Sequence, residues 1–222
     1  MQDGGDSVSV APRIQIIDYG LGNIFSIRQA CERASMTPIV SAAPEEIDRA
    51  DGIILPGVGA FGNAMDSLRN LNLVGPLCDA VTAGKPLMGI CLGMQLLFQE
   101  SEEFGTHTGL GLLPGTIRRI PDQVDGNRRL RVPNVGWNQA WIAEGVPNRE
   151  IMQGIPDGAY MYFVHSFYAA PADTADLLLT TTYGDLCYCC ATQRDHILGV
   201  QFHPEKSGPV GLKIYENWAR SI

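Results

Sequence analysis

The 222-residue chain has 45% hydrophobic residues and a formal net charge of −8, and it contains no run of apolar residues near the roughly 20 needed to cross a membrane. An acidic balance without a basic tract argues against a nucleic-acid-binding protein. The length suits one large α/β domain, which we expect at residues 13–222, after a polar N-terminal tail at residues 1–12.

The first hundred residues alternate between strand and helix patterns. Strands are predicted at 13–18, 37–40, 52–55 and 86–90, and helices at 24–34, 61–70 and 73–83, with a further helix opened by Cys91. This alternation predicts an open, mostly parallel sheet flanked by helices. Beyond Gly105, mixed or antiparallel strands are predicted at 111–120, 129–142, 159–170, 176–183, 186–194 and 197–202, followed by a closing helix at 209–220.

Cys91 lies at the centre of the string Gly-Ile-Cys-Leu-Gly, which spans residues 89–93. Glycines on both sides of a cysteine permit a sharp strand-to-helix turn that exposes the thiol at its apex. The amino end of the following helix would stabilise a thiolate, and the Leu92 N–H would supply half of an oxyanion hole. The string therefore predicts a nucleophilic cysteine.

His203 and Glu205 follow another apolar strand, in the string Gln-Phe-His-Pro-Glu at residues 201–205. Residues two apart on an extended segment share a face, so Glu205 could hold the imidazole whose other nitrogen meets Cys91. A lone histidine at a strand end is more often structural, but its combination with a cysteine at a sharp turn favours catalysis. Thiol, imidazole and carboxylate together predict a Cys-His-Glu nucleophilic enzyme.

The string Pro-Gly-Val-Gly at residues 56–59 ends the predicted strand at 52–55. Glycines there would let a peptide N–H turn inward as a second oxyanion donor, although a plain tight turn is the alternative. The cluster at Cys187–Cys190 lacks a second ligand pair at zinc-like spacing. With no export signal, we expect a cytoplasmic protein that uses neither cofactor nor metal.

Longer strings strengthen the enzymatic interpretation. They occupy residues 17–23, 56–61, 89–98, 135–138, 162–166 and 199–207. In this order and spacing they resemble the class I (triad) glutamine amidotransferases, and among these the glutaminase subunits of imidazole glycerol phosphate synthase, over about residues 13–220. The resemblance implies a flavodoxin-like sheet.

The resemblance also implies a role for each matched residue. Glutamine would form a thioester with Cys91, with His203 as the base and Glu205 as its orienting carboxylate. The oxyanion hole would comprise Gly57, Val58 and Leu92, and the glutamine site Gly59, Gln95, Ser166 and Phe167. The face toward a partner would comprise Asn23, Trp137, Tyr162 and Lys206.

The partner implied by the resemblance is a (β/α)8-barrel cyclase, joined in a heterodimer without nucleic acid or membrane. It would use the channelled ammonia to make imidazole glycerol phosphate and AICAR in histidine biosynthesis. Two positions depart from the family pattern: Asn134 stands in a string that often reads Pro-His-Met, and Phe167 stands where many relatives have Tyr.

Three alternatives stay open. A glutaminase subunit could serve a different synthase, for example a sugar-modifying one. A stand-alone cysteine hydrolase such as a peptidase would have no need of Gln95 or the Val-Gly-Trp-Asn string at 135–138. A non-catalytic partner-binding module would not need an intact set of Cys91, His203 and Glu205.

Overall fold

The centre of the structure is a run of parallel strands. The computed structural model describes residues 11–122, 129–145 and 150–222, so nearly all of the expected tail lies outside the described residues. The run is ordered β2 (Thr37–Ser41), β1 (Arg13–Ile17), β3 (Gly52–Leu55), β4 (Leu87–Ile90) and β13 (Ile197–Val200), with each neighbouring pair parallel. This arrangement confirms the predicted open, mostly parallel sheet.

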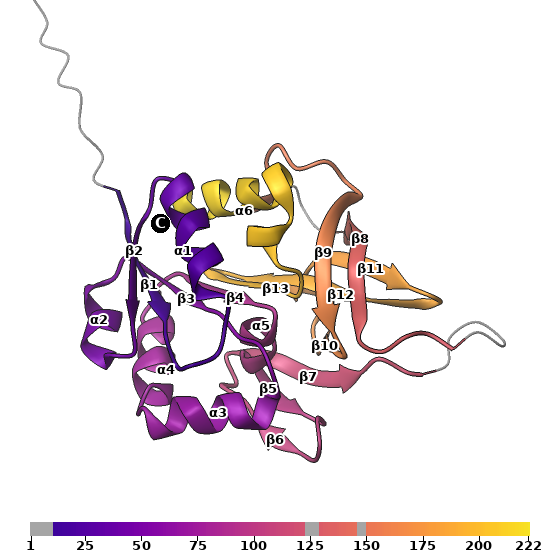
Figure 1. The fold of residues 1–222 in the computed structure, drawn as a ribbon, viewed down its shortest axis with the longest axis horizontal. Coiled ribbons are helices and arrows are strands. Elements are labelled where there is room, and N and C mark those ends of the chain that lie inside the picture. Colours follow the sequence, from indigo (N-terminus) through magenta and orange to yellow (C-terminus); the bar gives the residue numbers. More distant parts are fainter. Residues whose placement is uncertain (1–10, 123–128, 146–149) are drawn as a thin grey trace, which may run out of the picture.

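The second half of the chain adds antiparallel and mixed pairings, as predicted. From β13 the sheet continues through β12 (Leu186–Arg194), β10 (Phe167–Pro171), β7 (Leu113–Arg119), β5 (Phe98–Ser101) and β6 (His107–Thr108). An antiparallel branch leaves β12 through β11 (Leu177–Tyr183), β8 (Asn134–Ile142) and β9 (Ala159–His165). Figure 1 shows this branch projecting from the helical half of the molecule.

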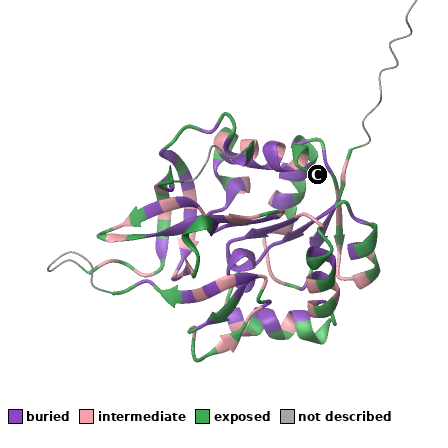
Figure 2. Ribbon diagram, turned by 180° about the vertical axis from the view of Figure 1, so that it is seen from behind, coloured by how far each residue is buried: buried purple, intermediate pink, exposed green. Residues whose placement is uncertain are grey.

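Helices cover both faces of the parallel strands (Figure 1). On one face lie α1 (Ile24–Arg33) and α6 (Gly208–Arg220), and on the other α2 (Pro44–Arg49), α3 (Phe61–Asn70) and α4 (Val74–Thr82). Strand side chains alternate between the two cores. In β3, for example, Ile54 packs in the core under α1 and α6, whereas Ile53 and Leu55 pack in the other. Figure 2 shows the resulting band of buried strands.

Several local details were not predicted from the sequence, among them the short strands β5 and β6. The short helix α2 was not predicted, although Pro44 opens it and two glutamates occupy its first turn, which are ordinary start signals. The segment predicted as one strand at 159–170 is divided at Ser166 into β9 and β10. The helix opened by Cys91, α5 (Leu92–Leu96), has only five residues. Within the described ranges, no helix is long and apolar enough to span a bilayer.

Lys85 ties α2 to the turn before β4. Its Nζ donates hydrogen bonds to the carbonyl oxygens of Ile47, Asp48 and Ala50, at 2.5, 2.9 and 2.6 Å. These carbonyls lie at the carboxyl end of α2, where a helix leaves its last carbonyls without intrahelical donors. The lysine thus satisfies the end of a helix too short to be stable alone.

We expect Lys85→Met to lower the free energy of unfolding by about 2 kcal/mol, because three carbonyls lose a charged donor. Urea denaturation measures the change. Lys213→Met is the matched control, since that lysine only pairs with Glu216 at the surface, and its loss should cost less than about 0.5 kcal/mol. Equal losses in the two variants would contradict the role given to Lys85.

Candidate active site

The predicted catalytic strings meet at one edge of the sheet. Because β3, β4 and β13 are adjacent and parallel, the residues that follow them emerge side by side at the carboxyl ends of the strands (Figure 1). The backbone N–H of Cys91 donates to the Val200 carbonyl at 2.8 Å, which fixes the thiol-bearing turn to β13. Topology therefore brings Cys91 and the segment around His203 together from 112 residues apart in sequence (203 − 91).

The turn at Cys91 has the geometry that its glycines predict. Cys91 has φ +56° and ψ −113°, a strained conformation for a residue with a side chain. A Cβ at Gly93 would lie 1.8 Å from the Leu55 carbonyl oxygen, and one at Gly89 would lie 2.9 Å from the Gly93 carbonyl. Only glycine allows this close approach of α5 to β3 and β4. Since α5 is so short, any stabilisation of a thiolate comes from local N–H groups more than from a helix dipole.

His203 and Glu205 form a buried pair. His203 Nδ1 lies 2.8 Å from Glu205 Oε1, and the two side chains are 4% and 0% exposed. The expectation of an extended segment was wrong, because His203 precedes a 3₁₀ turn over Pro204–Lys206 and the turn brings the carboxylate back to the ring. Ser207 stabilises this turn, because its hydroxyl donates a hydrogen bond of 2.7 Å to the His203 carbonyl.

The surroundings of His203 favour its charged form. Burial alone lowers the pKa of His203, but interactions with Cys91 and Glu205 together raise it to about 10. Hydrogen bonds and electrostatic interactions with Cys91 and Glu205 both favour the imidazolium form. The group is therefore poised to deliver a proton from Nε2, the nitrogen that Glu205 does not use.

The other thiols are unsuited to nucleophilic chemistry. Burial raises the pKa of both Cys31 and Cys189 to about 12, and it also raises the pKa of Cys190 well above its usual value. Cys187, the exposed thiol of this cluster, lies on β12 and does not line the pocket that contains Cys91. Among the described residues, no group of three or more His, Cys, Asp or Glu side chains could hold a metal ion.

A cavity of about 240 Å³ opens beside the thiol. Its lining comprises Val58, Gly59, Cys91, Leu92, Gln95, Glu103, Pro133, Val164, His165, Ser166, Phe167 and His203. Every residue predicted for the glutamine site therefore borders one cavity. Gly57 does not line it, because this residue packs against Tyr19 and Leu92, while the Tyr19 hydroxyl donates to the Pro56 carbonyl at 2.6 Å.

Gln95 is held rigidly inside this cavity. Its Nε2 donates to the Phe167 carbonyl and to Gln201 Oε1, each at 2.9 Å. Gln201 in turn directs its own Nε2 to the Cys91 Sγ, at 3.7 Å. Sequence reasoning did not assign Gln201 a role, although it lies in the same string as His203 and is fully buried.

Glu103 is a second residue that sequence reasoning missed. Its Oε2 accepts a hydrogen bond of 2.6 Å from the Phe61 N–H at the start of α3, and the residue lines the cavity. The position follows β5 with no motif around it, so only the fold reveals that a carboxylate faces the thiol cavity. An anionic group there offers a partner for a cationic ligand group.

Three of the residues predicted to face a partner form a cluster next to His203. The rings of Trp137 and Tyr162 pack edge to face with centroids 5.9 Å apart, and Lys206 Nζ lies 6.0 Å from the Tyr162 centroid. The Tyr162 ring lies 6.5 Å from that of His203. Asn23, the fourth, precedes α1 without capping it through its side chain.

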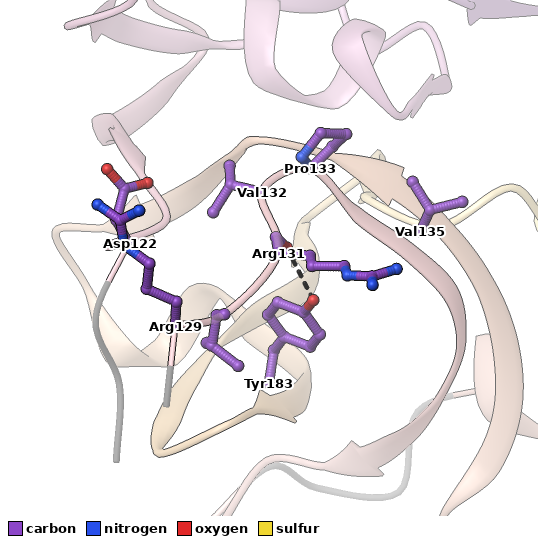
Figure 3. A pocket seen from close by; sticks show the side chains of 8 residues that line it. Asp122, Arg129, Arg131, Val132, Pro133, Val135 and Tyr183 are labelled. Atoms are coloured by element: carbon purple, nitrogen blue, oxygen red, sulfur yellow. Dashed lines mark hydrogen bonds between the residues drawn. The ribbon is translucent and has the colours of Figure 1, made fainter. Parts of the chain in front are cut away.

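A larger hollow of about 860 Å³ contains none of the predicted catalytic residues (Figure 3). Arg129, Arg131 and Tyr183 contribute to its wall, and the Tyr183 hydroxyl donates to the Arg131 carbonyl at 2.8 Å. It shares Pro133 with the thiol cavity. Size alone would favour this larger hollow, whereas the gathering of thiol, imidazole and carboxylate favours the smaller cavity as the candidate active site.

Known proteins resemble this chain over almost its whole length. The chain is 45% identical over 206 residues to "Imidazole glycerol phosphate synthase subunit HisH" of Syntrophotalea carbinolica, covering 92% of this chain and 98% of that protein. It is 44% identical to the protein of the same name from Geobacillus sp., covering 94% and 97%.

A solved structure supports the fold. "Structure of PurLQS from Thermotoga maritima" matches with a TM-score of 0.72 and 18% identity, covering 95% of this chain and 99% of that one. The profile of the family described as "Glutamine amidotransferase class-I" matches residues 15–221. With the thiol turn, the buried His-Glu pair and the cavity between them, this match shows that the chain belongs to the class I glutamine amidotransferases.

Proposed function

We propose that this chain is the glutaminase subunit of an imidazole glycerol phosphate synthase, acting in the cytoplasm as one catalytic domain over residues 13–222. The observation that carries the proposal is the single cavity bordered by Cys91, His203 and Gln95, with Glu205 held behind the histidine. We assign the pathway from relatives that are named as subunits of that synthase. They are more than 40% identical to this chain over almost its whole length.

In the proposed reaction, the Cys91 thiolate attacks the side-chain carbonyl carbon of glutamine. The N–H groups of Val58 and Leu92 would stabilise the resulting oxyanion, with Gly57 contributing the carbonyl side of the Val58 peptide. The His203 imidazolium then gives its Nε2 proton to the departing ammonia, leaving a γ-glutamyl thioester. The neutral imidazole next takes a proton from water, which attacks the thioester and releases glutamate.

The released ammonia would pass to a (β/α)8-barrel cyclase, which makes imidazole glycerol phosphate and AICAR. The cluster of Trp137, Tyr162 and Lys206, together with Asn23, would be the docking face. Trp137 is 53% exposed, which is unusual for so large an apolar side chain unless a partner covers it. Tyr162 accepts the His203 N–H through its carbonyl at 2.9 Å, so contact with the partner would bear directly on the catalytic segment.

Glu103 would bind the α-ammonium group of glutamine. We expect Glu103→Gln to raise the KM for glutamine roughly 10- to 100-fold with little change in kcat, because only the charge is lost far from the reacting amide. In the Glu103→Gln variant, the side-chain oxygen at position 103 can still accept the hydrogen bond from the Phe61 N–H. Glu102→Gln is the matched control in steady-state assays, since the exposed Glu102 accepts the Arg119 N–H outside the cavity. A KM unchanged in both variants would contradict the assignment.

The decisive experiment measures glutamate release from glutamine by the purified chain, alone and with a histidine-pathway cyclase plus the nucleotide ligand of that cyclase. Strong stimulation by the cyclase would support both the chemistry and the pathway. Slow hydrolysis that the cyclase does not stimulate would support the glutaminase activity but point to a different synthase as the partner. Absence of hydrolysis in both states would refute the proposal.

A further inference from the structure

A line of buried polar groups leads from the start of β8 to the Gln95 amide. Asn134 Nδ2 donates to the Tyr188 hydroxyl at 3.2 Å, and that oxygen lies 3.0 Å from His165 Nε2. His165 Nδ1 lies 2.8 Å from the Phe167 carbonyl oxygen, which also accepts from Gln95 at 2.9 Å. All five residues are at most 9% exposed, so these polar groups depend mainly on one another for their hydrogen bonds.

The chemistry of the groups fixes the direction of each bond. The Phe167 carbonyl can only accept, so Nδ1 of His165 carries the hydrogen. Burial lowers the pKa of His165 to about 4, partly offset by the bond to Phe167 and reinforced by the charge of His203, so the ring is neutral at neutral pH. Its Nε2 is then an acceptor, and the Tyr188 hydroxyl donates to it while accepting from Asn134.

The line ends by setting the orientation of the Gln95 side chain. Both hydrogens of the Gln95 amide nitrogen are used, one by the Phe167 carbonyl and one by Gln201 Oε1. Only the Gln95 oxygen can then bond to a ligand in the cavity, and it can accept but not donate. A substrate side-chain amide offers the N–H donor that such an acceptor requires.

We infer that Tyr188 and His165 are positioning residues, which hold the Phe167 carbonyl in place and thereby set Gln95 to accept from the amide of bound glutamine. Asn134 completes the line. The inference rests on the proposed glutaminase function and extends it to residues outside the triad. The inference also assigns a role to Asn134, which departs from the family pattern. Its side-chain amide donates the hydrogen bond that the Tyr188 hydroxyl accepts.

The kinetic test compares Tyr188→Phe with Tyr168→Phe. Tyr168 is the matched control, because its ring packs 5.3 Å from that of Tyr188 but lies outside the line. For Tyr188→Phe we expect the KM for glutamine to rise about tenfold, the effect of one typical hydrogen bond, with kcat changed less than threefold. Both parameters should stay at wild-type values in Tyr168→Phe.

Two variants of His165 separate positioning from packing. His165→Asn keeps an N–H near the place of Nδ1. It should therefore reverse most of the rise in KM that His165→Leu causes. Alkylation of Cys91 by iodoacetamide, which does not use Gln95, should proceed at the wild-type rate in Tyr188→Phe. A slowed alkylation together with a lower melting temperature would indicate general disruption and overturn the inference.

A spectroscopic test needs no activity. ¹⁵N NMR of the histidine ring should show His165 of the wild-type chain as the Nδ1–H form at pH 7, whereas Nε2–H is the usual neutral form in water. Finding Nε2–H would overturn the inference. So would an unchanged KM in Tyr188→Phe, provided the wild type hydrolyses glutamine. A wild-type chain inactive with and without the cyclase would instead refute the proposed function, and the inference with it.

Discussion

Cys91→Ala is expected to abolish glutamine hydrolysis, with kcat falling about 10⁴-fold or more, because none of the other described residues that line the cavity carries a thiol to form the thioester. His203 alone could activate only a water molecule, and the methyl side chain in Cys91→Ala cannot act as a nucleophile. Glutamate release in the presence of the cyclase is the most sensitive measurement, since stimulation would make even a small residual rate visible.

The same Cys91→Ala protein should still bind the proposed cyclase, because the cluster of Trp137, Tyr162 and Lys206 does not include the thiol. Cys78→Ala is the matched control, since that half-buried thiol donates weakly to the Leu110 carbonyl away from the cavity. Burial raises the pKa of Cys78 and makes it a poor nucleophile. Persistent ammonia release from Cys91→Ala, or its loss from Cys78→Ala, would show that the nucleophile is misassigned.

The sequence predicted most of this site because its signals are local. Gly89 and Gly93 flank Cys91 for a steric reason that the structure makes explicit, namely the approach of α5 to the Leu55 carbonyl. The strands β3 and β4 are continuous apolar runs, which is typical of buried parallel strands. Since parallel strands end at one edge, the meeting of Cys91 and His203 followed from the order of elements.

What the sequence could not predict depends on contacts between distant segments. Glu103 enters the cavity only because β5 pairs with β7 and the following turn reaches the start of α3. The role of His165 depends on Tyr188, a hydrogen-bond partner on another strand. His203 and Glu205 were predicted to pair on an extended segment, but the structure has a 3₁₀ turn there instead.

Glu205→Gln is expected to lower kcat/KM for glutamine by about 10² to 10⁴-fold, because an amide can hold the imidazole in the wrong tautomer and no longer stabilises its charge. The pH dependence should change as well. The pKa of His203 is raised to about 10, so the imidazolium that protonates ammonia persists through neutral pH and is lost only as the pH approaches that value.

Removing the carboxylate charge lowers the pKa of His203, so in Glu205→Gln the loss of activity at high pH should begin at a lower pH than in the wild type. Profiles of kcat/KM between pH 6 and 10.5 test this, with Glu216→Gln as the control because Glu216 pairs with Lys213 at the surface. An unshifted basic limb in Glu205→Gln would mean that Glu205 does not act on the charge of His203. Its buried 2.8 Å contact with Nδ1 would then serve only to orient the ring.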